Sequence, residues 1–195
     1  METVARDDRH RDVIGDAHAR RGVDDVGVSA PVDVHVLLGA ARRLRTCARM
    51  FNEGVWGAPL GDALFGRRAL IVGFGRIGKA VARRALGFDM RVIFYDPSEK
   101  KPNPDLKATP VDFETLLEES DFLSLHTPLT PDTRHLIDSE ALSKMKPNAV
   151  LVNTARGPIV DQQALYEALK ENRIFGAGLD VIAIEGHLRS ADGVS

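Results

Sequence analysis

Three closely spaced glycines are the residues of this chain best suited to binding a phosphate group. Gly73, Gly75 and Gly78 follow directly on the apolar run 69–72, and apolar residues at helical spacing come after them. In such a strand–turn–helix unit the first glycine permits a tight turn, the second lets the backbone approach a pyrophosphate, and the third lets the helix pack close to the strand. The start of the helix adds unpaired N–H groups and a partial positive charge. The spacing therefore predicts a site for the diphosphate of a dinucleotide.

An acidic residue at the end of the next apolar run extends this pattern. Asp96 closes that run and lies 23 residues after Gly73, the interval at which a carboxylate meets the ribose hydroxyls of an adenosine. It favours NAD over NADP, because a carboxylate repels a 2′-phosphate and no basic residue directly follows Asp96. The alternative interpretation is a plain turn between strand and helix, followed by a surface aspartate.

Polar residues also stand at the ends of three later apolar runs, and these are His126, the turn 154–156 and Asp180. In a sheet of parallel strands, ligands bind beyond the carboxyl ends of the strands. We therefore expect these residues and Asp96 to share one cleft.

Strands that alternate with helices predict an α/β fold with a doubly wound parallel sheet. We expect strands at 69–72, 90–96, 107–111, 121–126, 149–153 and 174–180. We expect helices at 32–53, 76–87, 112–119 and 139–145, and a last helix that is capped by Asp161 and ends near residue 171. The first helix is long, and its basic face is typical of a solvated surface. Trp56, in the loop that follows it, is either a core residue or an anchor at an interface.

The composition is that of ordinary globular material, with 44% hydrophobic and 28% charged residues among 195. A net charge of −2 argues against a nucleic-acid-binding surface. No apolar run approaches the ~20 residues of a membrane span, and the first residues lack a signal-peptide pattern. Cys47 is the only cysteine, so no internal disulfide can form. We therefore expect a cytoplasmic protein that binds neither nucleic acid nor a membrane.

Four blocks of the sequence resemble those of the NAD-dependent D-2-hydroxyacid dehydrogenases, and they are residues 70–78, 125–133, 146–157 and 178–181. The resemblance extends from about residue 32 to residue 185. It implies a Rossmann fold that binds NAD at residues 31–185, with only remnants of a substrate domain. The segment 1–30, rich in Arg and Asp, is expected to be poorly structured. Residues 186–195 are expected to form a divergent tail.

The resemblance also implies roles for residues around the glycine turn and the strand ends. The backbone of Arg76 and Ile77 would contact the pyrophosphate, and Thr127 and Pro128 would line the cofactor groove. Thr133 would lie near the phosphates. The residues expected to flank the nicotinamide are Thr154, Ala155 and Asp180.

Two residues correspond to catalytic positions of that family. Arg156 resembles the substrate arginine, whose guanidinium holds a carboxylate bidentately and polarises the adjacent carbonyl. The alternative is a structural surface arginine. Glu185, 29 residues after Arg156, corresponds to a glutamate that raises the pKa of a histidine serving as general acid and base. The family usually has proline after this glutamate, whereas here Gly186 follows.

The family's histidine block is not recognisable in residues 186–195, and residues 1–30 do not resemble the first half of its substrate domain. We therefore expect an oxidoreductase that transfers hydride between a 2-hydroxy acid and its 2-keto acid, in a truncated and catalytically impaired form. The family also implies a homodimer, because the helix at 32–53 and the Trp56 loop lie at its subunit interface. One alternative is a non-catalytic NAD-binding or dimerisation module. Another is an incomplete product that folds poorly because a normally covered surface is exposed.

Overall fold

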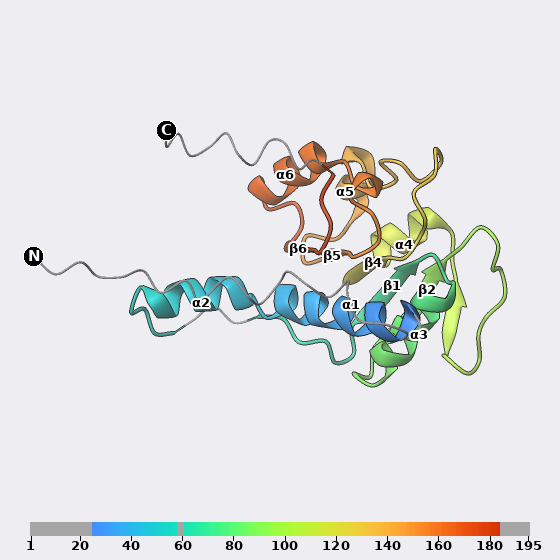
Figure 1. The fold of residues 1–195 in the computed structure, drawn as a ribbon, viewed down its shortest axis with the longest axis horizontal. Coiled ribbons are helices and arrows are strands. Elements are labelled where there is room, and N and C mark those ends of the chain that lie inside the picture. The colour runs from blue at the N-terminus through green and yellow to red at the C-terminus, as the bar shows by residue number, and fades with distance from the viewer. Residues whose placement is uncertain (1–24, 58–60, 184–195) are drawn as a thin grey trace, which may run out of the picture.

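A computed structural model describes residues 25–57 and 61–183 of the chain, and their side chains from residue 32 onward (Figure 1). The centre is a six-stranded parallel sheet with the strand order β3-β2-β1-β4-β5-β6. The strands are β1 (Arg68–Val72), β2 (Arg91–Tyr95), β3 (Ala108–Pro110), β4 (Phe122–Leu125), β5 (Val150–Asn153) and β6 (Gly176–Leu179). The direction of winding reverses between β1 and β4, so the predicted α/β fold with a doubly wound sheet is confirmed.

The strand pairings align the last residues of five strands at the carboxyl edge of the sheet. Val72, the last residue of β1, lies opposite Tyr95 of β2 and Leu125 of β4. Leu125 in turn lies opposite Asn153, and Asn153 lies opposite Leu179. The residues that follow these five positions are therefore brought to one edge of the sheet.

Helices cover both faces of the sheet and create two apolar cores. The helices are α1 (Asp25–Ala41), α2 (Leu44–Asn52), α3 (Arg76–Leu86), α4 (Phe113–Glu119), α5 (Ser139–Lys144) and α6 (Gln162–Lys170), with a 3-10 turn at Gly157–Ile159. Alternate side chains of β1 enter opposite cores. Ala69 and Ile71 pack with residues of α1 and α3, whereas Leu70 and Val72 pack with residues of α4, α5 and α6.

Helices α4, α5 and α6 each begin after an aspartate that caps them. Asp112 accepts a hydrogen bond from Thr115 N, and Asp138 accepts one from Ala141 N. Asp161, the predicted cap of α6, accepts from the first amides of that helix. Such caps satisfy backbone donors that the helix itself leaves unpaired. They fix where each helix starts after its loop.

The long helix predicted at 32–53 is wrong in one respect, because two helices occupy this region. α1 ends at Ala41, and Arg43 adopts a left-handed backbone conformation with φ of 51°. Asp62 N donates to the Ala41 carbonyl at 2.8 Å, and Gly61 lies so close that a Cβ there would meet Arg42 Cα at 2.6 Å. The returning chain thus takes the carbonyl that a continuous helix would use. α2 extends beyond the sheet, away from the strands (Figure 1).

The first helix also begins earlier than expected. Its first residue, Asp25, lies inside the segment 1–30 that was predicted to be poorly structured. Residues 1–24 and the predicted tail 186–195 lie outside the described residues. The three-part division of the chain at residues 30 and 185 therefore stays a prediction.

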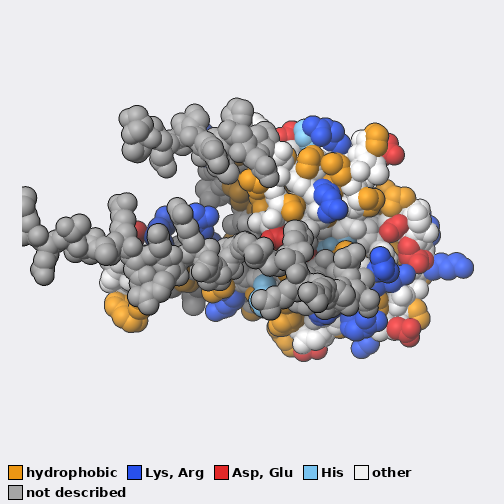
Figure 2. Space-filling model, viewed as in Figure 1, with side chains coloured by type: hydrophobic (Ala, Val, Ile, Leu, Met, Phe, Trp, Pro, Cys, Tyr) orange, Lys and Arg blue, Asp and Glu red, His pale blue; other side chains and the backbone are white. Residues whose placement is uncertain are grey.

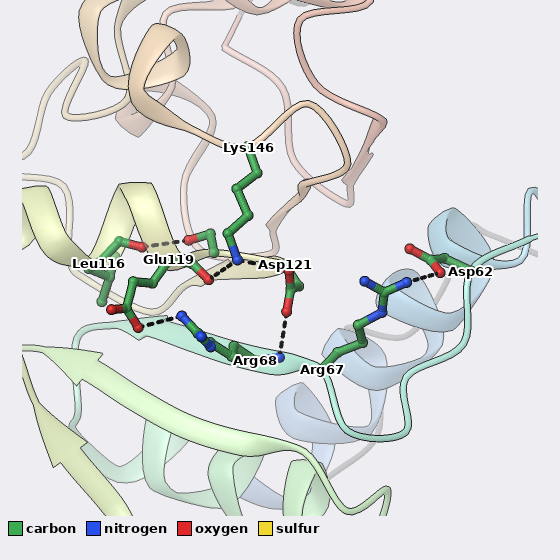
Figure 3. Close-up of polar contacts among 8 residues, drawn as sticks. Asp62, Arg67, Arg68, Leu116, Glu119, Asp121 and Lys146 are labelled. Carbon is green, nitrogen blue, oxygen red and sulfur yellow. Dashed lines mark hydrogen bonds and ion pairs between the residues drawn. The ribbon is translucent and has the colours of Figure 1, made fainter.

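A polar network ties the amino-terminal ends of the strands together (Figure 3). Asp121, just before β4, accepts a hydrogen bond from Arg68 N of β1 at 2.9 Å and one from Lys146 Nζ at 3.0 Å. Lys146 also donates to the Glu119 carbonyl, and the Arg68 guanidinium pairs with the Glu119 carboxylate at 2.6 Å. Burial alone would raise the pKa of Asp121. The hydrogen bonds from Arg68 N and Lys146, together with the positive charges of Lys146 and Arg67, outweigh burial and lower that pKa. The network stabilises the amino edge of the sheet, which is the edge opposite the glycine turn.

Within the ranges 25–57 and 61–183, no helix combines the length and the apolar character needed to cross a membrane.

Candidate cofactor groove

Two of the three glycines in the turn after β1 are required by the fold itself. Gly73 has φ of +89°, and a Cβ on it would lie 2.6 Å from the His126 carbonyl oxygen. A Cβ on Gly78 would lie 2.2 Å from the Gly73 carbonyl oxygen. Both positions therefore exclude side chains because backbone lies against them.

Gly75 differs from these two glycines, because a Cβ on it would meet no atom within 4 Å. Gly75 is the N-cap residue of α3, and no side-chain cap among the described residues satisfies the first amides of that helix. The start of α3 therefore combines open space beside Gly75 with first amides that no described side chain caps. This is the arrangement in which helix starts bind phosphate groups.

Asp96 lies directly against the glycine turn. Its Oδ2 accepts a hydrogen bond from Phe74 N at 2.7 Å, and its Oδ1 accepts one from Ser98 N at 2.8 Å. The carboxylate thus joins the turn after β1 to the loop after β2. Each carboxylate oxygen has a second lone pair left for a ligand hydroxyl.

Asp96 and the glycine turn line a cleft of about 400 Å³ at the carboxyl edge of the sheet, here called the Asp96 cleft. A second cleft of about 230 Å³, the Arg156 cleft, follows the ends of β4 and β5. His126, Thr127 and Pro128 line both clefts. The two clefts are therefore neighbours with a shared wall and form one groove across the carboxyl ends of the strands.

Most of the predicted site residues line this groove. The Asp96 cleft contains Gly73, Gly75, Asp96, Thr127, Pro128 and Thr133, and the Arg156 cleft contains Ile77, Thr127, Pro128, Thr154, Ala155 and Arg156.

Three of the predicted site residues that the structure describes line neither cleft. Arg76 is exposed at the first position of α3, and Gly78 is buried against Gly73. Asp180 follows β6 with an exposed side chain, and its N–H donates to the Asn153 carbonyl at 3.0 Å. Glu185 lies outside the described residues.

The turn 154–156 is shaped by a buried residue that the sequence patterns did not single out. Asn153 is 1% exposed; its amide nitrogen donates to the Arg156 carbonyl at 3.0 Å, and its amide oxygen accepts from Ala155 N at 3.1 Å. The Arg156 side chain is exposed, and one of its guanidinium nitrogens donates to the Ala155 carbonyl at 2.6 Å. The other N–H groups of that guanidinium have no hydrogen bond to the described residues that would keep them from a ligand. Arg156 is thus held at the groove with donors to spare.

Thr133 lines the Asp96 cleft, but its hydroxyl is used within its own loop. It donates to the Pro128 carbonyl at 2.6 Å, and its oxygen accepts from Thr130 N at 2.8 Å. These bonds connect residues 128, 130 and 133 within the loop after β4. The geometry therefore favours a loop-shaping role for this side chain.

A buried carboxylate behind the groove was missed at the level of sequence. Asp33 of α1 is 1% exposed, and its Oδ1 accepts a hydrogen bond from the Thr154 hydroxyl. Among the described residues, no group donates a hydrogen bond to its Oδ2, which lies 3.8 Å from His126 Nδ1. The signal was present in the sequence, because Asp33 lies one helical turn before Val36 and Leu37, on the apolar face of the first helix.

Burial dominates the titration of this pair. It raises the pKa of Asp33 to about 6; the Thr154 hydrogen bond and Arg84 oppose the rise, and the charge of Asp180 adds to it. Burial lowers the pKa of His126 to about 4. His126 is therefore neutral at neutral pH, with Nε2 2.9 Å from the Ser124 hydroxyl. It is poorly suited to donate a proton there.

Comparison with known families finds a match that covers the residues of this groove. The family model described as the NAD binding domain of D-isomer specific 2-hydroxyacid dehydrogenases matches residues 34–191. That range includes every predicted site residue, Glu185 among them.

Individual relatives agree with the family model. The chain is 44% identical over 165 residues to a hydroxypyruvate reductase of Thermotoga maritima, covering 82% of this chain and 53% of the relative. It is 51% identical over 157 residues to a glyoxylate reductase of Korarchaeum cryptofilum, covering 77% of this chain and 47% of the relative. The chain therefore spans about half the length of the curated relatives that it matches.

A solved structure shares both the fold and the sequence pattern. The NAD-complexed D-isomer specific 2-hydroxyacid dehydrogenase of Lactobacillus delbrueckii ssp. bulgaricus superposes with a TM-score of 0.76 at 33% identity. The match covers 89% of this chain and 54% of that one.

Proposed function

The chain belongs to the D-isomer specific 2-hydroxyacid dehydrogenase family, and on this basis we propose that it serves NAD(H)-dependent hydride transfer between a 2-hydroxy acid and its 2-keto acid. Its described part is the NAD-binding domain of that family. Bound NADH supplies the hydride for reduction of the keto acid. The residues of this chain bind the cofactor, orient the substrate and shape the electrostatics of the groove.

One observation carries the proposal, which is the contact between the glycine turn and Asp96. The amides at the start of α3 are open at Gly75, and Phe74 N in the same turn donates to Asp96 Oδ2 at 2.7 Å. A diphosphate bound at those amides would leave its adenosine ribose beside Asp96. The groove leads from there to the turn 154–156, which supports a cofactor lying across the strand ends.

At the other end of the groove, we assign substrate binding to Arg156. Its exposed guanidinium has donors beyond the one used by the Ala155 carbonyl. Such a group can hold the carboxylate of a 2-keto acid and stabilise negative charge on its reacting carbonyl. Glu185 is the second catalytic residue proposed, acting on the proton donor. The donor itself is a group other than His126, since the pKa of His126 is lowered to about 4.

The substrates proposed are small 2-keto acids, because the relatives include hydroxypyruvate and glyoxylate reductases. The assay follows NADH absorbance with glyoxylate, hydroxypyruvate and pyruvate. Arg156→Ala should lower kcat/KM by about 10²–10³ while NADH still binds. Arg173→Ala is the matched control, because that exposed arginine pairs with Glu171 outside both clefts.

Two results would contradict this proposal in different ways. Absence of any NADH fluorescence change on titration would remove the cofactor assignment. Binding of NADH with equal background turnover in the wild type and Arg156→Ala would favour a non-catalytic NAD-binding module.

A homodimer through α2 is a further part of the proposal. No residue of α2 is buried, and Leu44, Phe51 and Trp56 are 59%, 64% and 84% exposed. Figure 2 shows hydrophobic side chains at the end of the molecule where α2 lies. Exposed apolar groups of this size mark interaction surfaces. Sedimentation equilibrium should give twice the chain mass of 21.3 kDa, and a monomer at micromolar concentration would argue against the dimer.

A cytoplasmic location also remains a proposal, supported by the single cysteine, Cys47, which cannot form a disulfide within the chain.

A further inference from the structure

The carboxylate of Asp33 is poorly accommodated as a purely structural group. It is 1% exposed, it accepts one hydrogen bond from Thr154, and no described residue donates to its Oδ2. A buried charge with an unsatisfied oxygen destabilises a fold. An asparagine of the same shape would accept the same hydrogen bond and would turn an N–H toward the neutral His126 ring. The charge therefore costs stability that an isosteric neutral side chain would not.

The position of Asp33 connects it to the groove through two residues. Thr154 and His126 both line the Arg156 cleft, and both face the Asp33 carboxyl group from behind that lining. Because the Thr154 hydroxyl donates inward to Asp33, it can only accept hydrogen bonds on the side of the groove. The charged carboxylate thus sets the hydrogen-bond polarity of Thr154 and adds a negative potential to this end of the groove.

We propose that Asp33 is a positioning residue that makes the nicotinamide end of the groove prefer the oxidised, cationic cofactor over the reduced one. The inference rests on the proposed binding of NAD(H) in this groove, with the nicotinamide at Thr154. The oxidised nicotinamide ring carries a positive charge and the reduced ring is neutral, so a fixed buried anion stabilises the oxidised form selectively. Because the Asp33 carboxylate is buried, its attraction for a charged ring in the groove is screened less than an attraction between two exposed charges.

Other charged groups face the same region and set the background for this effect. Asp180 after β6 adds negative charge, and Arg84 of α3 opposes it. His126 after β4 contributes no charge at neutral pH. The pKa of Asp33, raised to about 6, places the change in its charge between pH 5 and pH 7.

The test compares the dissociation constants of NAD⁺ and NADH, measured by isothermal titration calorimetry at pH 7.5. Asp33→Asn should weaken NAD⁺ binding about tenfold and change NADH binding by less than about twofold. The same variant should melt about 2–4 °C higher than the wild type, because the unsatisfied charge is gone. A residue with a structural role alone would not combine higher stability with selective loss of NAD⁺.

Lowering the pH provides a second readout on the same protein. As Asp33 takes up its proton below about pH 6, the wild-type preference for NAD⁺ should decline, whereas the preference of Asp33→Asn should stay flat. Asp121→Asn is the control, since it removes a buried carboxylate at the opposite edge of the sheet and should leave the NAD⁺ to NADH ratio unchanged.

The outcomes separate this inference from the proposed function. Equal weakening of both cofactors by Asp33→Asn, or no change in either, would overturn the role of Asp33 while leaving the NAD site intact. A wild-type chain that binds neither cofactor would overturn the proposed function and this inference together.

Discussion

Two buried aspartates at opposite edges of the same sheet differ in the hydrogen bonds that they accept and in the direction in which their pKa is shifted. Asp121, at the amino edge, accepts hydrogen bonds from Arg68 N and Lys146 Nζ, and its pKa is lowered. Asp33, at the carboxyl edge, has an Oδ2 without a donor among the described residues, and burial raises its pKa to about 6. One carboxylate is matched to its surroundings and the other is not.

The difference indicates which edge of the sheet is built for stability and which for binding. A buried carboxylate that accepts hydrogen bonds from protein donors is satisfied without a ligand, and it stabilises the fold. A carboxylate whose charge is incompletely satisfied, next to a groove, is typical of a functional site. The Gly73 and Gly75 positions repeat this contrast within one turn, since backbone fills the space beside Gly73 and open space lies beside Gly75.

The largest change in stability is expected at the amino edge. Asp121→Ala leaves the Arg68 amide and one Lys146 donor without their acceptor, so the free energy of unfolding should fall by about 2–3 kcal/mol. Urea denaturation would measure this loss. Cofactor affinity, measured on the folded variant, should stay within about twofold of the wild type. A strong loss of NADH binding by a folded Asp121→Ala variant would remove the division of roles between the two edges.

A smaller effect, with a defined pH dependence, is expected at Asp33. Its folded pKa of about 6 exceeds the ordinary aspartate value of 3.8, so the native state binds the extra proton and this group lowers stability as pH rises between those values. Asp33→Asn lacks this loss. Its stability advantage should therefore be small at pH 4 and reach at most about 3 kcal/mol above pH 6.

His126 acts with the opposite sign in the same pH range. Its lowered pKa means that the native state rejects a proton, so its contribution to stability is lost as pH falls from 6.5 toward 4. The wild type and Asp33→Asn both contain His126, so the difference in stability between these two proteins reports on Asp33. Urea midpoints at pH 4.5 and pH 7.5 test this, and an advantage that shrinks as pH rises would contradict the assignment.

Much of the fold could be predicted because its signals are local. Apolar runs followed by glycine or polar residues located five of the six strands, all except β3, and Asp161 marked the start of α6. The break at Arg43 was not predictable in this way, because it depends on the backbone of Gly61 and Asp62 returning against the end of α1. Contacts between segments distant in sequence decide such breaks.

The site was predictable to the extent that chemistry follows the strand ends. Asp96, Thr154 and Arg156 could be located because the residues after parallel strands meet at one edge. Asp33 was missed because it lies on a helix, and its place beside Thr154 arises only when α1 packs across β5 and β6. Asn153 was hidden as the last residue of an apolar strand.

The most direct test of the account is an NADH titration, followed by fluorescence, of the wild type and of Gly75→Asp. Aspartate is a good N-cap residue and suits the positive start of α3, so the variant should be at least as stable as the wild type. Its charge would occupy the open space beside Gly75 and repel a diphosphate. We predict saturable binding by the wild type and an affinity at least about 100-fold weaker in Gly75→Asp. Equal NADH affinity in both proteins, or no saturable binding by the wild type, would contradict the central claim.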